Sequence, residues 1–191
     1  GVYLQDSYDS IIEDNEITAT AASAMGVNVM QDCDNITIRR NNISMFDSGN
    51  GINYRTSTNG QITHNIINTS YDAAKGIYLS TTSSGINVSS NTVETASSNG
   101  IHLFSNLNSI NIEYNNITTT TGEGIYFQNT VQNSNVTGNR ITTSGASGYG
   151  IYMVGGTVRY NRVTSNNVST TGTLGHGIYM YYLNYNNNVE D

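Results

Sequence analysis

Apolar and polar residues alternate in short stretches that recur along the whole chain. Each stretch opens with a glycine, an apolar residue, a variable residue and a second apolar residue, as in Gly76-Ile77-Tyr78-Leu79. An alternation with a period of two residues is typical of a strand that buries one face. A helical repeat would need amphipathic stretches of about ten residues or more, and the sequence shows none. The pattern therefore predicts short strands that repeat from end to end.

The glycines set the length of the repeat. Units begin at Gly1, Gly26, Gly51, Gly76, Gly100, Gly124, Gly150 and Gly177, and a partial unit runs to Asp191. Each unit also carries an apolar-x-x-Asn-x-apolar segment, as in Ile38 to Ile43, which we interpret as a second strand, a tight bend and a third strand. We therefore predict one all-β domain, residues 1–191, folded as a right-handed parallel β-helix of about 7.5 coils of roughly 24–27 residues, with three short strands per coil.

Two structural roles follow from the repeat. The glycine that opens a unit marks either a backbone position with positive φ or a place where a side chain would clash. The bend asparagines predict an amide ladder, because asparagine tolerates the left-handed region and stacked copies can hydrogen-bond along the axis. The predicted ladder residues are Asn15, Asn41, Asn65, Asn91, Asn115, Asn139 and Asn166.

Composition and charge narrow the class of partner. The net charge is −7, with seven Lys and Arg against fourteen Asp and Glu, which disfavours a phosphate-binding surface. We therefore expect no nucleic acid partner. No apolar run reaches the length of a membrane span, so we also expect no membrane insertion. A single cysteine, Cys33, excludes an internal disulfide, and we interpret it as a small, partly buried side chain.

The glycine and asparagine motifs resemble the parallel β-helix repeat family of the pectate-lyase-like superfold. That superfold includes polysaccharide lyases and hydrolases, phage tailspikes and adhesin-like surface proteins. The richness in Asn, Ser, Thr and Tyr is most similar to the surface-protein branch. The repeated residues belong to the scaffold, and no catalytic motif of the family matches residue by residue, so the resemblance implies a fold more than a function.

An aromatic column follows from the repeat. The variable residue after Gly-apolar points outward, and from the fourth coil onward it is aromatic at Tyr78, His102, Tyr126, Tyr152 and Tyr179. Aromatic side chains on such a face can stack against sugar rings, form a subunit interface, or stack on one another for stability alone. All three interpretations remain open from the sequence.

Acidic residues give weaker candidates for chemistry. Asp47 and Asp72 each lie four residues before the next unit's glycine, so we expect them one coil apart in the same turn, with Arg55 and Lys75 nearby. Glycoside hydrolysis needs two carboxyl groups about 5–9.5 Å apart, which makes them catalytic candidates. A second group could hold calcium, the one cofactor considered: Asp6, Asp9, Asp32 and Asp34. The three histidines occupy different columns, so we predict no histidine-ligated metal site.

The sequence also predicts ion pairs between neighbouring coils and N-glycosylation sites on the surface. Column alignment places Glu13 opposite Arg39 and Asp14 opposite Arg40, and such exposed pairs chiefly fix the register. Asn-x-Ser or Asn-x-Thr sequons are usable glycosylation sites if the chain is exported. They occur at Asn35, Asn42, Asn68, Asn87, Asn116, Asn135 and Asn167.

Two functions fit this surface. The favoured hypothesis is a non-enzymatic extracellular or cell-surface module, structural or adhesive, that presents a Tyr, Asn and Thr surface to glycans, other surface proteins or further copies of itself. The alternative is a polysaccharide lyase or glycoside hydrolase, including a tailspike-like one. Because both ends break off within the coil motif, we expect the domain to be part of a longer chain or to join others end to end in an oligomer or filament.

Overall fold

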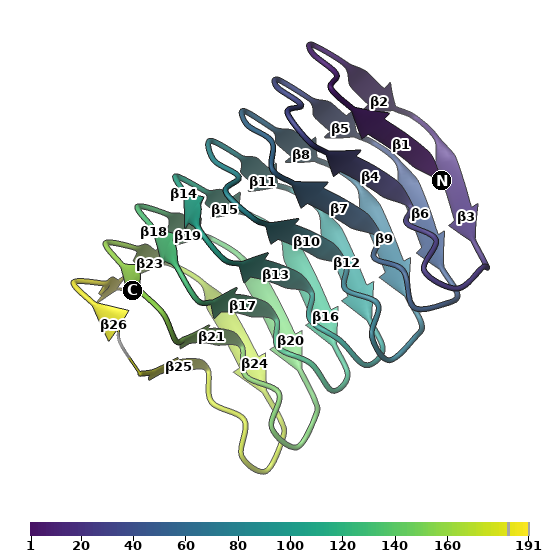
Figure 1. The fold of residues 1–191 in the computed structure, drawn as a ribbon. Coiled ribbons are helices and arrows are strands. Elements are labelled where there is room, and N and C mark those ends of the chain that lie inside the picture. Colours follow the sequence, from purple (N-terminus) through teal and green to yellow (C-terminus); the bar gives the residue numbers. More distant parts are fainter. Residues whose placement is uncertain (183, 191) are drawn as a thin grey trace.

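The computed structural model describes residues 1–182 and 184–190 as one continuous stack of parallel coils (Figure 1). The first sheet holds the strands that follow the repeat glycines, which pair in sequence order from one end of the stack to the other. They are β1 (Val2–Gln5), β4 (Val27–Met30), β7 (Ile52–Arg55), β10 (Ile77–Ser80), β13 (Ile101–Phe104), β17 (Ile125–Gln128), β21 (Ile151–Val154) and β25 (Ile178–Tyr181).

Two further sheets run along the stack. The second contains β2 (Ile11–Glu13), β5 (Thr37–Arg39), β8 (Gln61–Thr63), β11 (Asn87–Ser89), β15 (Asn111–Glu113), β19 (Asn135–Thr137), β23 (Arg162–Thr164) and β27 (Asn188–Glu190). The third contains β3 (Glu16–Ala19), β6 (Asn42–Met45), β9 (Ile66–Thr69), β12 (Thr92–Thr95), β16 (Asn116–Thr119), β20 (Arg140–Thr143) and β24 (Asn167–Thr170). The predicted all-β parallel solenoid with three main strands per coil is confirmed.

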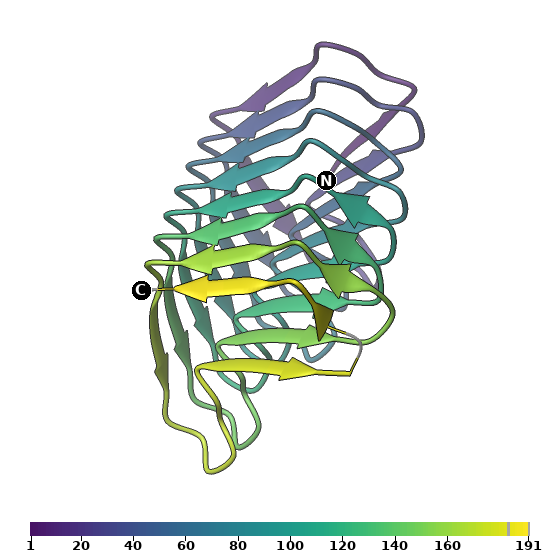
Figure 2. The same ribbon diagram turned by 90° about the vertical axis from the view of Figure 1, so that its left-hand side faces the viewer.

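A fourth, narrower sheet was not predicted. It lies in the turn between the first two sheets, where Figure 2 shows its short arrows at the coil edge. Its strands have two residues each: β14 (Leu107–Asn108), β18 (Val131–Gln132), β22 (Val158–Arg159) and β26 (Asn184–Tyr185). In the earlier coils the same turn carries single bridges, such as Tyr8 to Asp34 and Asp34 to Thr58. Backbone hydrogen bonding therefore continues through this turn along the stack.

The core is a stack of inward-facing aliphatic columns. Each strand of the first sheet turns two apolar side chains inward, and these pack against the inward-facing residues of the other two main sheets. Tyr54 is the largest fully buried side chain, and its hydroxyl donates to the carbonyl of Thr58 at 3.0 Å. Gly60 makes room for the Tyr54 ring, because a Cβ there would lie 2.7 Å from the ring. The large and small residues thus complement one another across the interior.

The repeat glycines avoid a steric clash. None of those between Gly26 and Gly150 has positive φ. A Cβ on Gly51 would instead lie 2.4 Å from Ile67 Cγ2 and 2.7 Å from the carbonyl oxygen of Gly76. Of the two reasons offered by the sequence, close approach between coils is the one that holds.

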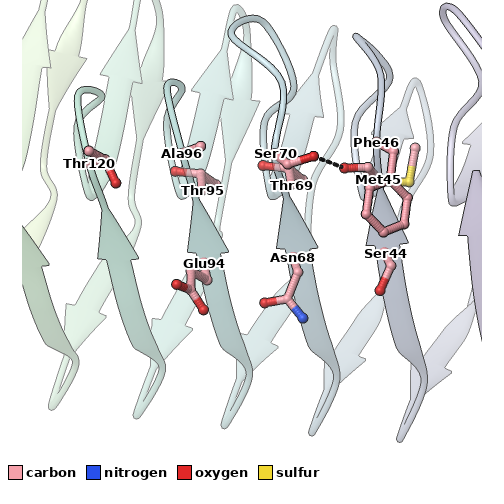
Figure 3. A pocket seen from close by; sticks show the side chains of 10 residues that line it. All are labelled: Ser44, Met45, Phe46, Asn68, Thr69, Ser70, Glu94, Thr95, Ala96 and Thr120. Carbon is pink, nitrogen blue, oxygen red and sulfur yellow. Dashed lines mark hydrogen bonds between the residues drawn. The ribbon is translucent and has the colours of Figure 1, made fainter. Parts of the chain in front are cut away.

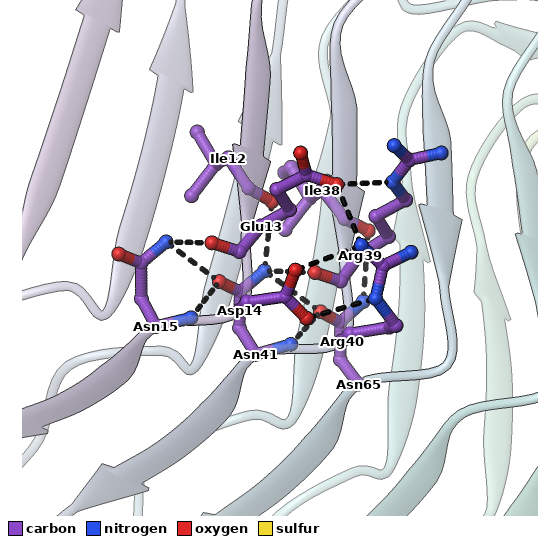
Figure 4. Close-up of polar contacts among 9 residues, drawn as sticks. All are labelled: Ile12, Glu13, Asp14, Asn15, Ile38, Arg39, Arg40, Asn41 and Asn65. Carbon is purple, nitrogen blue, oxygen red and sulfur yellow. Dashed lines mark hydrogen bonds and ion pairs between the residues drawn. The ribbon is translucent and has the colours of Figure 1, made fainter.

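The predicted asparagine ladder is present (Figure 4) and is buried from Asn41 to Asn139, whereas Asn15 is exposed and Asn166 is half-buried. From Asn41 to Asn139, each amide Nδ2 donates to Oδ1 of the asparagine on the following coil, at 3.0 Å from Asn41 to Asn65 and 2.9 Å from Asn115 to Asn139. The same amide also donates to a carbonyl on the preceding coil, as Asn115 does to Val88 at 2.9 Å. One detail of the prediction is wrong, because the left-handed residue is the one before each asparagine, such as Arg40 with φ 53°.

The predicted charge pairs join the first two coils beside this ladder (Figure 4). Arg39 Nε donates to Glu13 Oε2 at 2.7 Å. Arg40 Nη2 donates to Glu13 Oε2 at 2.7 Å and to Asp14 Oδ2 at 2.8 Å. The hydrogen bond from Arg39 is the main cause that lowers the pKa of Glu13, and the bond from Arg40 likewise lowers the pKa of Asp14. All four side chains are exposed to solvent, so salt screens the pairs.

We expect an Arg40→Gln variant to lower the midpoint of thermal unfolding, Tm, by no more than a few degrees at neutral pH. Both carboxyl pKa values are lower in the folded state, so the stabilisation is present above the unfolded-state pKa values and is lost as the pH falls through the folded ones. The Tm difference between variant and wild type should therefore shrink at about pH 2, which circular dichroism can follow. Arg140→Gln is the control, because Arg140 forms no ion pair within residues 1–182 and 184–190. A difference that persisted at acidic pH would contradict the assignment.

Candidate functional site

The aromatic column lies on the outer face of the first sheet. Strand register places the five predicted aromatic residues on consecutive coils, since Tyr78 pairs with His102 and His102 with Tyr126. Tyr152 and Tyr179 continue the column on β21 and β25. The four tyrosines are half-buried, whereas His102 is 6% exposed. The sequence therefore predicted both the members of the column and their order.

From His102 onward the rings of the column stack on one another, whereas the planes of Tyr78 and His102 are tilted by 57°. Ring centroids are 4.7 Å apart between His102 and Tyr126, 5.1 Å between Tyr126 and Tyr152 and 5.4 Å between Tyr152 and Tyr179. The planes differ by at most 24° in these pairs, which is offset stacking. A ring inside the column, such as that of Tyr126, thus has a neighbour on both faces, and its edge and hydroxyl remain for a ligand. Inside the column, the geometry favours mutual stacking over sugar stacking.

Flanking aromatic residues widen this face. The sequence analysis missed them because it considered only one outward position in each coil, the second residue after the repeat glycine. Tyr149 and His176 come directly before the repeat glycines, and their rings lie 5.7 Å apart and 11° from parallel. Tyr149 also contacts Tyr152 and Tyr179, with centroids 4.9 Å apart in each pair. The outward position at the strand end adds Phe104 and Tyr181. If the residue before each repeat glycine and the last residue of each first-sheet strand had also been aligned between coils, all four aromatic residues would have been found.

His102 is held as a neutral imidazole. Burial, with a smaller contribution from the Lys75 ammonium, lowers the pKa of His102 to about 4. Its Nε2 lies 3.0 Å from Gln128 Oε1, which accepts a hydrogen bond when the proton is on Nε2. Its Nδ1 is buried, with no hydrogen-bond partner in the described part of the chain. The ring therefore behaves as one more flat side chain in the stack.

Two titratable groups beside the column, Glu123 and Lys75, and Tyr126 within it also have shifted pKa values. Burial raises the pKa of Glu123, which lies beside Tyr126. Burial is also the main cause that raises the pKa of Tyr126 to about 12, and the Glu123 charge adds to it. Burial lowers the pKa of Lys75, whose Nζ lies 5.4 Å from the Tyr78 ring centroid. Shifted groups gathered on one face are typical of functional sites as well as of buried polar clusters.

A cleft of about 410 Å³ opens where the aromatic column ends. The register partner of Tyr78 on the preceding coil is Asn53, so Tyr78 has no ring beyond it on that side. Asn53 and Asn28 form the floor, joined by a hydrogen bond of 2.6 Å from Asn53 Nδ2 to Asn28 Oδ1. Phe104 and the exposed cation of Arg55 also line the cleft, with Met25, Met30, Asn50, Ser80 and Thr81. An aromatic ring, amides and a guanidinium therefore meet in one place.

The two aspartates predicted for catalysis are not among the residues that line this cleft. Asp47 is in the loop after β6, where its Oδ1 accepts a hydrogen bond from the Ser48 amide at 2.7 Å. Asp72 is exposed in the loop after β9. Met45 pairs with Thr69, so Asp47 is the second residue after its strand and Asp72 the third. One extra residue in the second loop thus breaks the equivalence inferred from the glycine spacing, and catalysis by this pair stays a prediction.

The four aspartates predicted to hold calcium, Asp6, Asp9, Asp32 and Asp34, lie in turns of the first two coils. Asp6, Asp9 and Asp32 have φ of 47°, 50° and 51°, a region that aspartate adopts more readily than most residues. Asp34 Oδ1 accepts hydrogen bonds from Thr58 and from Asn59, which lower its pKa. In the described ranges, no group of three or more His, Cys, Asp or Glu side chains could hold a metal ion. Calcium binding remains a prediction without a ligand set.

The sequon asparagines all reach the surface. Asn35, Asn42, Asn116, Asn135 and Asn167 are exposed, and Asn68 and Asn87 are half-buried. Modification of these side chains is sterically open and stays a prediction.

Cys33 is buried in the core, with its Sγ 3.3 Å from the Met30 carbonyl oxygen, and has no disulfide partner. Of the residues described, none lies in a helix that could cross a membrane.

A family model described as "Right handed beta helix region" matches residues 1–141. The chain belongs to the right-handed β-helix family. This agrees with the glycine and asparagine repeat and with the stack of parallel coils. No curated protein is similar enough in sequence to count as a match.

Solved structures share the fold at low identity. The periplasmic alginate epimerase AlgG is 14% identical, with a TM-score of 0.72 over 98% of this chain and 46% of its own. DFA-IIIase from Arthrobacter chlorophenolicus A6, solved in complex with DFA-III, is 11% identical, with a TM-score of 0.72 over 100% and 52%. The surface protein and adhesin PfbA of Streptococcus pneumoniae is 11% identical, with a TM-score of 0.52 over 99% and 66%. The chain spans about half the length of the first two, and at these identities the likeness concerns the fold.

Proposed function

We propose that this chain is an extracellular or cell-surface β-helix module that binds acidic glycans in the cleft beside Tyr78. The observation that carries the proposal is the end of the ring stack, where Tyr78 meets Asn53 and Arg55. Aromatic rings pack against the C–H groups of a sugar, amides bond its hydroxyls, and a guanidinium pairs with a carboxylate. A cation exposed in a cleft of a chain with net charge −7 favours an anionic ligand.

The structural neighbours support a carbohydrate ligand. They include an alginate epimerase, a DFA-IIIase solved in complex with DFA-III, and an adhesin. A periplasmic protein and a surface protein among them are consistent with a location outside the cytoplasm. The choice of an acidic sugar comes from the cleft itself, because Arg55 lines it directly and Lys75 lies beside Tyr78.

Binding can be tested by calorimetry with oligogalacturonate and oligomannuronate as acidic probes and cello-oligosaccharides as neutral ones. We expect at least one acidic probe to bind, Arg55→Gln to weaken binding about tenfold or more, and Tyr78→Ser to weaken it by about fivefold. Arg159→Gln and Tyr160→Ser are matched controls, because this Arg and Tyr pair, with 5.4 Å from guanidinium to ring centroid, lies outside the cleft. Equal loss in test and control variants, or no acidic probe bound, would refute the proposal.

The wide aromatic surface also favours self-association through the same face. Tyr126→Ser combined with Tyr152→Ser should leave the coils intact, because both side chains point outward from β17 and β21. If the face joins copies of the chain, sedimentation velocity should show wild-type oligomers that the double variant lacks. Unchanged sedimentation would remove the face as an interface.

Catalysis is a further candidate function, and the half-buried Glu123 beside Tyr126 is the observation that favours it. A carboxyl with a raised pKa can serve as a general acid, and a phenol can donate or accept a proton. His102 is 6% exposed, which leaves its ring little room to reach a substrate. A cleaved or unsaturated product from the same probes, lost in Glu123→Gln or in Asp47→Asn and Asp72→Asn, would replace the binding proposal with an enzymatic one.

A further inference from the structure

A second pocket lies on the third sheet, away from the aromatic column (Figure 3). It has a volume of about 360 Å³, within the range of small-ligand sites. Side chains from β6, β9 and β12, from the loops that follow them and from the loop after β16 line it. They are Ser44, Met45, Phe46, Asn68, Thr69, Ser70, Glu94, Thr95, Ala96 and Thr120.

The floor of this pocket is a row of three polar side chains. Ser44, Asn68 and Glu94 are register partners on neighbouring strands and point outward (Figure 3). Parallel strands lie about 4.8 Å apart, so the row offers a hydroxyl, an amide and a carboxylate over roughly 10 Å. This is the spacing of hydroxyl groups around one or two sugar rings.

These three groups do not make the cross-coil hydrogen bonds that several outward amides on the other two sheets make. Asn53 donates to Asn28, Asn87 to Gln61 and Asn135 to Asn111. Within the described residues, the side chains of Ser44, Asn68 and Glu94 have no such partner. Their donors and acceptors are free for a ligand at no cost in protein hydrogen bonds.

One wall of the pocket is an aromatic ring. Phe46 follows β6, its side chain is 58% exposed, and its ring lies over the Ser44 end of the row (Figure 3). Phe46, Ser70, Ala96 and Thr120 follow their strands in register and form the upper edge. The ten lining residues include one charged group, Glu94, and no cation. An anionic ligand would be repelled here, in contrast to the cleft that contains Arg55.

We propose that this pocket binds a neutral sugar residue. The Glu94 carboxylate accepts hydrogen bonds from two sugar hydroxyls, Asn68 Nδ2 and the Ser44 hydroxyl bond a third, and the C–H face of the sugar packs on Phe46. The module then carries two glycan sites of different selectivity on different sheets. This site does not depend on the acidic-glycan cleft, since the two share no residue.

The test is a titration of ¹⁵N-labelled protein, made in bacteria without glycosylation, with cellobiose, maltose, lactose and mannobiose as neutral probes. Digalacturonate is the anionic probe. We expect at least one neutral disaccharide to give saturable shifts of the Asn68 side-chain NH₂ and of the Glu94 amide, and digalacturonate to give none there. Phe46→Ala and Glu94→Gln should each weaken binding by about tenfold, from loss of the stacking face and of a charged acceptor.

Two controls separate this site from the rest of the surface. Tyr114→Ala removes a ring that is 65% exposed outside the pocket and should leave neutral-sugar binding unchanged. Arg55→Gln should also leave it unchanged, so failure of the acidic-glycan cleft is distinguishable from failure here. The inference is overturned if no neutral disaccharide gives saturable shifts up to about 50 mM, or if Phe46→Ala leaves the shifts intact.

Discussion

An Asn115→Asp variant should lose about 3–5 kcal/mol of stability at neutral pH, because it places a carboxylate among buried acceptors. Asn115 is 1% exposed. Its Nδ2 donates to Asn139 Oδ1 and to the Val88 carbonyl, both at 2.9 Å. Aspartate keeps the acceptor that Asn91 needs but has no donor for these two oxygens. The ladder is then broken in its middle, where neighbouring coils cover it on both sides.

The loss in Asn115→Asp should depend on pH with a defined sign. Burial beside two acceptor oxygens raises the folded-state pKa of the new carboxyl above its unfolded value of about 3.9. The folded state then holds the proton more tightly, so the destabilisation is smallest below about pH 4 and grows as the pH rises toward the folded-state pKa. Urea unfolding of variant and wild type across this range gives the difference directly.

Asn116→Asp is the matched control for this experiment. Asn116 is the next residue, begins β16 and is exposed, so the same chemical change there should alter the unfolding free energy by about 0.5 kcal/mol or less. If the two variants lost equal stability, or if the loss in Asn115→Asp did not change with pH, the ladder would not be a buried donor network.

The fold could be predicted because the positions with the strictest structural requirements carry the same residue type in each coil. Glycine is required at the coil openings from Gly26 to Gly150, since a Cβ there would meet the next coil, and asparagine is required wherever an amide must both donate and accept. The residue that takes positive φ before each ladder asparagine left no such signal. It is Asp14, Arg40, His64, Ser90, Tyr114, Gly138 or Ser165, and this variety hides a backbone constraint.

The sequence also contained no signal for the turn that forms the fourth sheet. Strands of two residues, such as Leu107–Asn108, show no alternation of apolar and polar positions that a sequence pattern could reveal. Tyr54 and Gly60 show a further limit. Both residues are visible in the sequence, but their complementarity depends on which inward columns face each other across the core.

The sequence predicted the members of the aromatic column, but neither the orientation of their rings nor the cleft at its end. The repeat fixed which coils carry Tyr126 and Tyr152, but register alone does not set the ring planes, which lie 6° apart and cover each other's faces. The change from Asn53 to Tyr78 marked where the column ends, yet the cleft there also requires Met25, Met30 and Phe104 from other columns. The pocket on the third sheet had no motif, because Ser44, Asn68 and Glu94 differ in type.

Gly100→Ala should lower the unfolding free energy by about 3 kcal/mol or more, the upper end of the usual cost of overpacking. The added Cβ would lie 2.4 Å from Ile117 Cγ2 and 2.7 Å from the Gly124 carbonyl oxygen. That oxygen accepts a hydrogen bond from the Ile101 amide at 2.9 Å, so it cannot withdraw without breaking the ladder between coils. Ile117 is fully buried and, as a β-branched residue, has few rotamers in which to yield.

Gly177→Ala tests whether the close approach, and not the loss of glycine itself, causes this effect. Gly177 occupies the same motif position, but among residues 1–182 and 184–190 an added Cβ there would have a single neighbour within 4 Å, Val168 Cγ1 at 3.9 Å. Alanine also lowers the entropy of the unfolded chain, so Gly177→Ala should be neutral or stabilising by up to about 1 kcal/mol. Chemical unfolding of both variants measures the contrast. Equal losses at the two positions would show that the motif requires glycine for backbone conformation, and the assignment of the repeat glycines to steric contact between coils would fall.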